Sequence, residues 1–202
     1  MRAVLRGVGH AYPGGNPLFT ALTVTLEPDR VYGLVGPSGS GKSTLLAIVA
    51  GWLRPTYGRV ERNGIESVRW VLQNPHGVAR RSAIDHVALP LMARGLPRRR
   101  AQAAAAALLV DFGIGSTADR QFRDLSGGEA QRLMLARAMA CEPSLCLVDE
   151  PTAQLDQHSA AAVSQSLAAL ASKGSIVVVA THDPQARAAC TDIIDLTDHA
   201  PT

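Results

Sequence analysis

The stretch GPSGSGKST, residues 36–44, contains one of only two lysines in a chain whose other basic residues are eighteen arginines. It follows a short apolar run at residues 30–36 and leads into the helical sequence KSTLLAIVAGWL. Glycines at this spacing let several backbone N–H groups point into one concavity, and a helix N-terminus adds partial positive charge. The order of strand, glycine-rich loop, lysine and helix therefore predicts a phosphate-binding loop.

There is a chemical reason why this loop contains a lysine and not an arginine. A compact ammonium fits against the outer phosphates of a nucleotide in a tight backbone nest, whereas a broad guanidinium fits badly. The Ser43 hydroxyl is expected to complete a Mg²⁺ shell. The loop alone leaves open whether the nucleotide is ATP or GTP, and a plain glycine-rich turn also fits. The residues expected to contact the nucleotide are Gly36, Pro37, Ser38, Gly39, Ser40, Gly41, Lys42, Ser43 and Thr44.

Length and composition indicate one globular domain over residues 1–202, with 47% hydrophobic and 18% charged residues. The formal net charge is +3, but no lysine–arginine stripe with interleaved aromatics is present. We therefore expect a solvated arginine-rich surface and no nucleic-acid partner. The three cysteines form no Cys-x-x-Cys pair, which is typical of a reduced compartment.

Membrane segments are not expected in this sequence. No apolar run approaches the roughly 18 residues needed to cross a bilayer, and the first residues do not resemble a signal peptide. Any role at a membrane would therefore act through another chain.

The pattern of apolar runs predicts an α/β fold. Continuous Val, Ile and Leu runs alternate with helical segments, which is typical of a mostly parallel sheet covered on both faces, here as a P-loop NTPase core. Alternating residues near the start, at 2–8 and 22–26, predict a small N-terminal antiparallel β part. Alanine-rich helical sequence over about 75–124 predicts an inserted helical subdomain. We expect the apolar run before His182 to be the last buried strand.

A pair of acids follows one of the buried strands, in SLCLVDEPT. Ligands of parallel α/β sheets bind at the carboxyl ends of the strands, where Asp149 would emerge. We expect Asp149 to hold Mg²⁺, usually through water, and Glu150 to orient and deprotonate an attacking water. Two solvated acids at a turn are the alternative.

A second helix start, LSGGEAQR, also has the features of an anion site. Ser126 and Glu129 form the Ser-x-x-Glu pattern of a capping box. Gly127 and Gly128 each cost a helix up to about 1 kcal/mol relative to alanine, so a simple cap does not require them. Bare backbone suits the close approach of an anion, and a second copy of the chain could supply the phosphate. An ordinary capped helix fits the same residues.

The order of GPSGSGKST, Gln73, LSGGEAQR, LCLVDEPT, AQLD and His182 resembles that of the ATP-binding cassette (ABC) ATPases over nearly the whole chain. The resemblance implies a homodimer that forms head to tail on ATP binding and encloses two ATP molecules. Each ATP would contact the phosphate loop of one copy and Ser126, Gly127 and Gly128 of the other.

The same resemblance implies roles for four further residues. Tyr12 matches the aromatic residue that stacks on adenine, which favours ATP. Gln73 matches the glutamine that reaches Mg²⁺ and the attacking water, and it begins the segment facing the transport partner. His182 would contact the γ-phosphate, and Asp156 lies in the loop that communicates across the dimer. Within AQLD, Gln154 stands where relatives often have asparagine or alanine.

The function implied is that of an energy-coupling ATPase at the cytoplasmic face of the membrane, acting on a separate permease subunit. Residues 83–114 resemble the lipoprotein-release and macrolide-export type of ABC ATPase. A soluble ABC protein acting on ribosomes or DNA, or a nucleotide-gated scaffold without transport, are the alternatives. Arg98–Arg100 form either a solvated helix start or a contact for anionic lipid headgroups.

Overall fold

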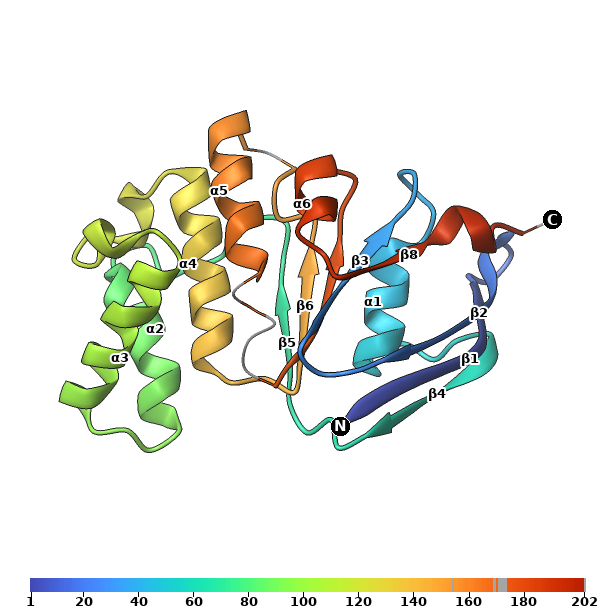
Figure 1. Cartoon of the computed structure of the whole chain (residues 1–202), viewed down its shortest axis with the longest axis horizontal. Helices are drawn as coiled ribbons and strands as arrows, with labels where there is room; N and C mark the ends of the chain where they lie inside the picture. Colours follow the sequence, from blue (N-terminus) through green and yellow to red (C-terminus); the bar gives the residue numbers. More distant parts are fainter. Residues whose placement is uncertain (154, 169, 171–173, 202) are drawn as a thin grey trace.

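Two sheets and six helices make up the computed structural model, which describes residues 1–153, 155–168, 170 and 174–201 (Figure 1). The antiparallel sheet has the strand order β2-β1-β4, with β1 Arg2–Ala11, β2 Pro17–Leu26 and β4 Tyr57–Asn63. The parallel sheet has the order β5-β6-β7-β3-β8, with β3 Arg30–Val35, β5 Val68–Val71, β6 Leu145–Asp149, β7 Ile176–Ala180 and β8 Asp192–Asp195.

The helices are α1 Lys42–Ala50, α2 Ala83–Ala93, α3 Arg98–Asp111, α4 Gly127–Ala140, α5 Gln157–Ala168 and α6 Pro184–Ala188. Short 3₁₀ turns lie at Gly115–Thr117, Phe122–Asp124 and Leu196–His199. Figure 1 shows α2 and α3 at the end of the molecule opposite the antiparallel sheet. The α/β class with a parallel core and a small antiparallel part is confirmed.

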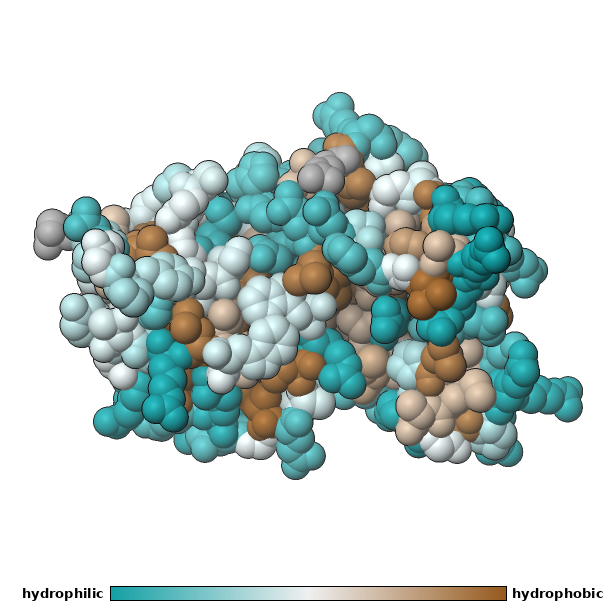
Figure 2. All heavy atoms as spheres, turned by 180° about the vertical axis from the view of Figure 1, so that it is seen from behind, coloured by the Kyte–Doolittle hydropathy of each residue, from teal (hydrophilic) through white to brown (hydrophobic). Residues whose placement is uncertain are grey.

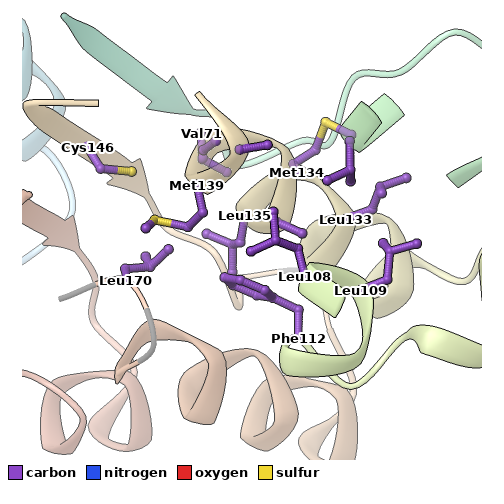
Figure 3. Packing of buried hydrophobic residues seen from close by; sticks show 14 of the residues in the cluster. Val71, Leu108, Leu109, Phe112, Leu133, Met134, Leu135, Met139, Cys146 and Leu170 are labelled. Atoms are coloured by element: carbon purple, nitrogen blue, oxygen red, sulfur yellow. The ribbon is translucent and has the colours of Figure 1, made fainter. Parts of the chain in front are cut away.

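Both faces of the parallel sheet are buried because its strands alternate between two apolar clusters. In β6, Leu145 and Leu147 pack towards α1 and the antiparallel sheet. Their neighbours Cys146 and Val148 pack towards α4, α5 and α6. Figure 3 shows part of this second cluster, in which Met139 of α4 points towards Cys146 and Leu135 of α4 lies on the side of Phe112. Helices α1 and α4 therefore cover opposite faces of one sheet.

The structure contains one strand that the sequence does not predict, beyond β7. Strand β8 follows it and pairs in parallel with β3, from Tyr32 opposite Asp192 to Val35 opposite Asp195. It contains only two apolar residues between acids, and Ile193 is 40% exposed, so it has no buried run to reveal it. Strand β5 ends at Val71, two residues before Gln73.

Large apolar side chains are also found on the surface, among them Trp52, Leu72, Val78 and Val110. Figure 2 shows that apolar side chains on one face are scattered in small patches among polar ones. In the part of the chain that the structure describes, no helix combines the length and hydropathy needed to cross a bilayer.

Truncation of the α4 core residue Leu135 tests the second cluster. Leu135 has no exposed surface, and Leu135→Ala should lower the free energy of unfolding by about 2–5 kcal/mol because a cavity replaces the side chain. Val110→Ala, at a side chain that is 66% exposed, is the matched control and should change it by less than about 0.5 kcal/mol. Urea unfolding measures both. Equal losses would contradict the assigned packing.

Candidate functional site

The phosphate loop, the acidic pair and His182 follow three parallel strands that end side by side. In the sheet register, Ala180 of β7 lies opposite both Leu34 of β3 and Asp149 of β6. Beyond the strands, the Glu150 N–H donates to the Ala180 carbonyl at 2.8 Å, and the Thr181 N–H donates to the Leu34 carbonyl at 3.1 Å. The sheet therefore brings the phosphate loop, the acidic pair and His182 to one edge.

Two glycines of the phosphate loop are required by its shape. Gly36 has a φ of 147°, and Gly41 has a φ of 94°. A Cβ on Gly36 would lie 2.8 Å from the Ser40 hydroxyl oxygen, and one on Gly41 would lie 2.9 Å from the Phe19 ring. The loop can therefore curl in front of α1 only with glycine at both positions.

Lys42 points back into its own loop. Its side chain is 9% exposed, and Nζ donates to the Gly36 carbonyl at 2.9 Å and to the Pro37 carbonyl at 3.3 Å. Nζ also lies 3.4 Å from Oε1 of Glu150. The ammonium thus occupies the centre of the concavity in which phosphates are expected.

Glu150 links this lysine to His182. Its Oε2 lies 2.8 Å from His182 Nδ1 and accepts a hydrogen bond from the His182 backbone N–H at 3.3 Å. Glu150 is a non-glycine residue with a φ of 44°, a conformation that costs of order 1–3 kcal/mol. Its carboxylate is 14% exposed, whereas the His182 side chain is 66% exposed. Such backbone strain is concentrated at functional sites, and here it aims the carboxylate at Lys42.

Asp149 has a carboxylate oxygen that is available to bind a cation. Its Oδ1 is buried and has no hydrogen-bond partner among the described residues. Burial raises the pKa of Asp149, Glu150 adds to this rise, and the Ser43 hydroxyl and the Lys42 charge oppose it. The described residues contain no group of three or more His, Cys, Asp or Glu that could hold a metal alone. A Mg²⁺ ion here would therefore need phosphate oxygens and water as further ligands.

Tyr12 reaches the same site from the antiparallel sheet. Its hydroxyl shares a hydrogen bond with the Thr44 hydroxyl, with 3.2 Å between the oxygens. The side chain remains 51% exposed at the connection between β1 and β2. The structure thus places an aromatic face beside the phosphate loop, as the stacking role requires.

Gln73 lies just beyond the end of β5, and its side chain is exposed. Val71 of β5 pairs with Val148 of β6, so Gln73 and Asp149 follow neighbouring strand ends. Its neighbours Leu72 and Asn74 line a cavity of about 280 Å³ between β5 and α4. Gln73 makes no hydrogen bond to Lys42 or Glu150 within the described part of the chain, so its role stays a prediction.

The start of α4 carries the predicted capping box. The Ser126 N–H donates to Glu129 Oε2 at 2.7 Å, and the Glu129 N–H donates to Ser126 Oγ at 3.2 Å. Gly127 is exposed, but Gly128 is buried, and a Cβ on it would lie 2.7 Å from Ser159 Cβ. Close packing on α5 therefore explains Gly128 without a ligand, which the sequence analysis did not anticipate. The bare backbone at Gly127 has no such explanation.

Asp156 caps the following helix. Its carboxylate accepts hydrogen bonds from the Ser159 N–H at 3.0 Å and from the Ser159 hydroxyl at 2.7 Å. These bonds, led by the one from the hydroxyl, lower the pKa of Asp156. Asp156 thus starts α5 beside the start of α4, while Gln154 of the same motif lies outside the described residues.

Comparison with known proteins shows to which family the chain belongs. The profile of the ABC transporter family matches residues 19–153. The chain belongs to the ABC transporter family. The matched stretch contains the phosphate loop, the α4 start and the acidic pair, which confirms the resemblance drawn from the sequence.

Two relatives and one solved structure show the extent of the match to this ABC protein. The lipoprotein-releasing system ATP-binding protein LolD 2 of Caulobacter vibrioides is 37% identical over 198 residues, covering 89% of this chain and 87% of that protein. The pyoverdine export ATP-binding/permease protein PvdT of Pseudomonas savastanoi pv. phaseolicola is 36% identical over an alignment of 213 positions that covers 96% of this chain. The ABC chain spans only about a third, 32%, of the length of that second relative.

The solved structure is the dimeric post-hydrolysis state of the ATP-binding cassette MJ0796 bound to ADP and Pi. Its TM-score is 0.78 at 28% identity, and the match covers 96% of this ABC chain and 94% of that one. The site geometry described above is therefore set in the fold of an ATP-binding cassette.

The two glycines at the start of α4 should respond differently to alanine. Gly128→Ala should destabilise the ABC domain by about 1–3 kcal/mol because its Cβ overlaps Ser159. Gly127→Ala, whose Cβ would meet only Leu155 Cδ2 at 3.4 Å, should be neutral or gain up to about 1 kcal/mol from helix propensity. Thermal unfolding of both variants measures this. Equal stabilities would refute the packing explanation for Gly128.

Proposed function

We propose that this chain is the ATP-binding and ATP-hydrolysing subunit of an ABC transporter. In this proposal it forms a homodimer on ATP binding and drives a separate transmembrane permease subunit. The observation that carries the proposal is the continuous contact from Lys42 through Glu150 to His182 at the edge where β3, β6 and β7 end. A phosphate-binding ammonium and a carboxylate held beside it are the parts that phosphoryl transfer to water requires.

The catalytic steps follow from these contacts. ATP entering the loop replaces the Gly36 and Pro37 carbonyls as partners of the Lys42 ammonium, which then neutralises charge on the outer phosphates. Glu150 is released from Lys42 but stays oriented by His182, and it accepts a proton from the attacking water. The water oxygen bonds to the γ-phosphorus while the bond from that phosphorus to the bridging oxygen breaks, giving ADP and phosphate.

Asp149 and Ser43 are the protein groups that would hold Mg²⁺, with Gln73 as a further ligand. The buried Asp149 Oδ1, which has no hydrogen-bond partner in the described part of the chain, supports this assignment. A bound Mg²⁺ supplies charge neutralisation to the phosphates. Together, Asp149, Ser43 and Gln73 would keep the phosphates of ATP beside the start of α1.

The homodimer is supported by the placement of the two anion-binding helix starts. Helix α1 packs in the cluster on one face of the parallel sheet, and α4 packs in the cluster on the other. Ser126 and Gly127 therefore start a helix on the other face of the sheet from α1, and in our proposal they do not complete the phosphate site of their own chain. A second copy arranged head to tail would place them there, and Asp156 at the start of α5 would then lie at the junction.

The permease and the location of the protein belong to the same proposal. The relative LolD 2 is named as the ATP-binding protein of a lipoprotein-releasing system, and PvdT as an ATP-binding/permease protein. We propose that this chain lies peripherally at the cytoplasmic face of the membrane as one ABC domain over residues 1–202. Residues 75–124 would be its helical subdomain, and the cavity beside Leu72 and Asn74 would face the permease.

Replacing the proposed base should separate binding from hydrolysis. Glu150→Gln keeps the size of the side chain but cannot take a proton, so ATP turnover should fall about 100-fold or more. Because ATP is no longer consumed, this variant should be a dimer in saturating ATP and a monomer without nucleotide. Size-exclusion chromatography with light scattering measures the mass. A strictly monomeric variant in saturating ATP would count against the homodimer.

Removing the loop lysine should weaken nucleotide binding. Lys42→Ala should raise the Kd for ATP at least tenfold, or by about 1.4 kcal/mol, because the phosphates lose their buried positive partner. Lys42→Ala combined with Glu150→Gln controls for the carboxylate left without its ammonium and should also bind weakly. Titration calorimetry measures the Kd of both variants. Unchanged ATP affinity would contradict the assignment of residues 36–44 as the phosphate-binding loop.

A further inference from the structure

The ring of Tyr12 is fixed by two contacts. Its hydroxyl is tied to Thr44 at the start of α1. Its ring packs perpendicular to the His10 imidazole, with 4.9 Å between the ring centroids and an interplanar angle of 86°. Perpendicular aromatic pairs at this distance are favourable. The ring is therefore oriented relative to the phosphate loop although half of it is open to solvent.

His10 is itself held in place by Thr56. The imidazole is 5% exposed in β1, and its Nδ1 lies 3.3 Å from the Thr56 hydroxyl oxygen. The same hydroxyl accepts from the Ala11 N–H and donates to the Ala11 carbonyl, both at 3.1 Å. One hydroxyl oxygen can satisfy all three groups if the imidazole proton is on Nδ1. The end of β1, just before Tyr12, is thus held through the backbone of Ala11 and through His10.

A buried imidazole is an unusual choice for packing alone. His10 Nε2 is buried and has no hydrogen-bond partner among the described residues. An aliphatic residue would fill the same strand position without an unpaired polar atom, which costs about 1–3 kcal/mol. The imidazole provides two contacts that an aliphatic side chain cannot make, namely the hydrogen bond to Thr56 and the aromatic pair with Tyr12.

We infer that His10 is a positioning residue, which orients the Tyr12 ring so that the adenine base of ATP stacks on its open face. The inference rests on the proposed function, since it requires that ATP binds and that Tyr12 receives the base. His10 does not touch the nucleotide. His10 therefore affects only the share of the ATP affinity that adenine stacking contributes. The phosphate loop holds the phosphates independently of His10.

A base-free probe separates this role from a structural one. Titration calorimetry compares magnesium ATP with magnesium tripolyphosphate for the wild type, His10→Ala, His10→Phe and Tyr12→Ala. His10→Ala should weaken ATP binding roughly three- to tenfold, the range expected for loss of an aromatic pair, and leave tripolyphosphate binding unchanged. His10→Phe keeps an aromatic ring and should restore ATP binding to within about twofold of the wild type.

The double variant completes the test. Once Tyr12→Ala has removed the ring, adding His10→Ala should cause no further loss of ATP affinity. Wild-type ATP affinity in His10→Ala, or an equal loss for ATP and tripolyphosphate, would overturn the inference. A wild-type chain that binds neither probe, or a Tyr12→Ala variant that binds ATP normally, would instead refute the proposed function or the stacking role.

A measurement on the wild type covers the case in which the His10 variants do not fold. The chain has only three tyrosines, so ring-labelled tyrosine gives a simple NMR spectrum. A nuclear Overhauser effect between the His10 and Tyr12 rings, retained when ATP binds, supports the inference. The Tyr12 signals should shift with ATP and not with tripolyphosphate. Absence of the effect, or a ring that leaves His10 when ATP binds, overturns it.

Discussion

The in-register pairing of β3, β6 and β7 is the constraint on which the site depends. These strands are buried on both faces, so neither a shift in register nor a change in length is tolerated without exposing apolar side chains. Because Leu34, Ala180 and Asp149 lie across from one another, the residues after each strand end must meet. The apolar core thereby fixes the distances between Lys42, Glu150 and His182, although those residues contribute little to it.

In our proposal, one chain alone holds only part of the ATP site at this edge. Within it, the Lys42 ammonium donates hydrogen bonds to loop carbonyls and forms an ion pair with Glu150, so the phosphates of ATP must compete with internal partners. The second helix start lies on α4, across the sheet from α1. In our proposal, closing two copies on ATP brings this start to the phosphates and turns nucleotide binding into movement of a permease.

The sequence predicted the parallel core, the phosphate loop and the acidic pair, because each depends on local patterns such as apolar runs, glycine spacing and a strand end. It missed β8, whose two isoleucines are flanked by acids. They can be recognised as part of a strand only from their pairing with β3. It did not anticipate the packing of Gly128, since only the tertiary contact with Ser159 shows that a side chain is excluded there. His10 was missed because its contacts to Thr56 and Tyr12 join separate segments.

A crystal structure of Glu150→Gln with bound ATP tests most directly whether two copies share each nucleotide. Our account predicts that every triphosphate contacts Lys42 of one protomer and the backbone around Ser126 and Gly127 of its partner. A structure in which ATP fills the phosphate loop while the start of α4 faces no phosphate would contradict it.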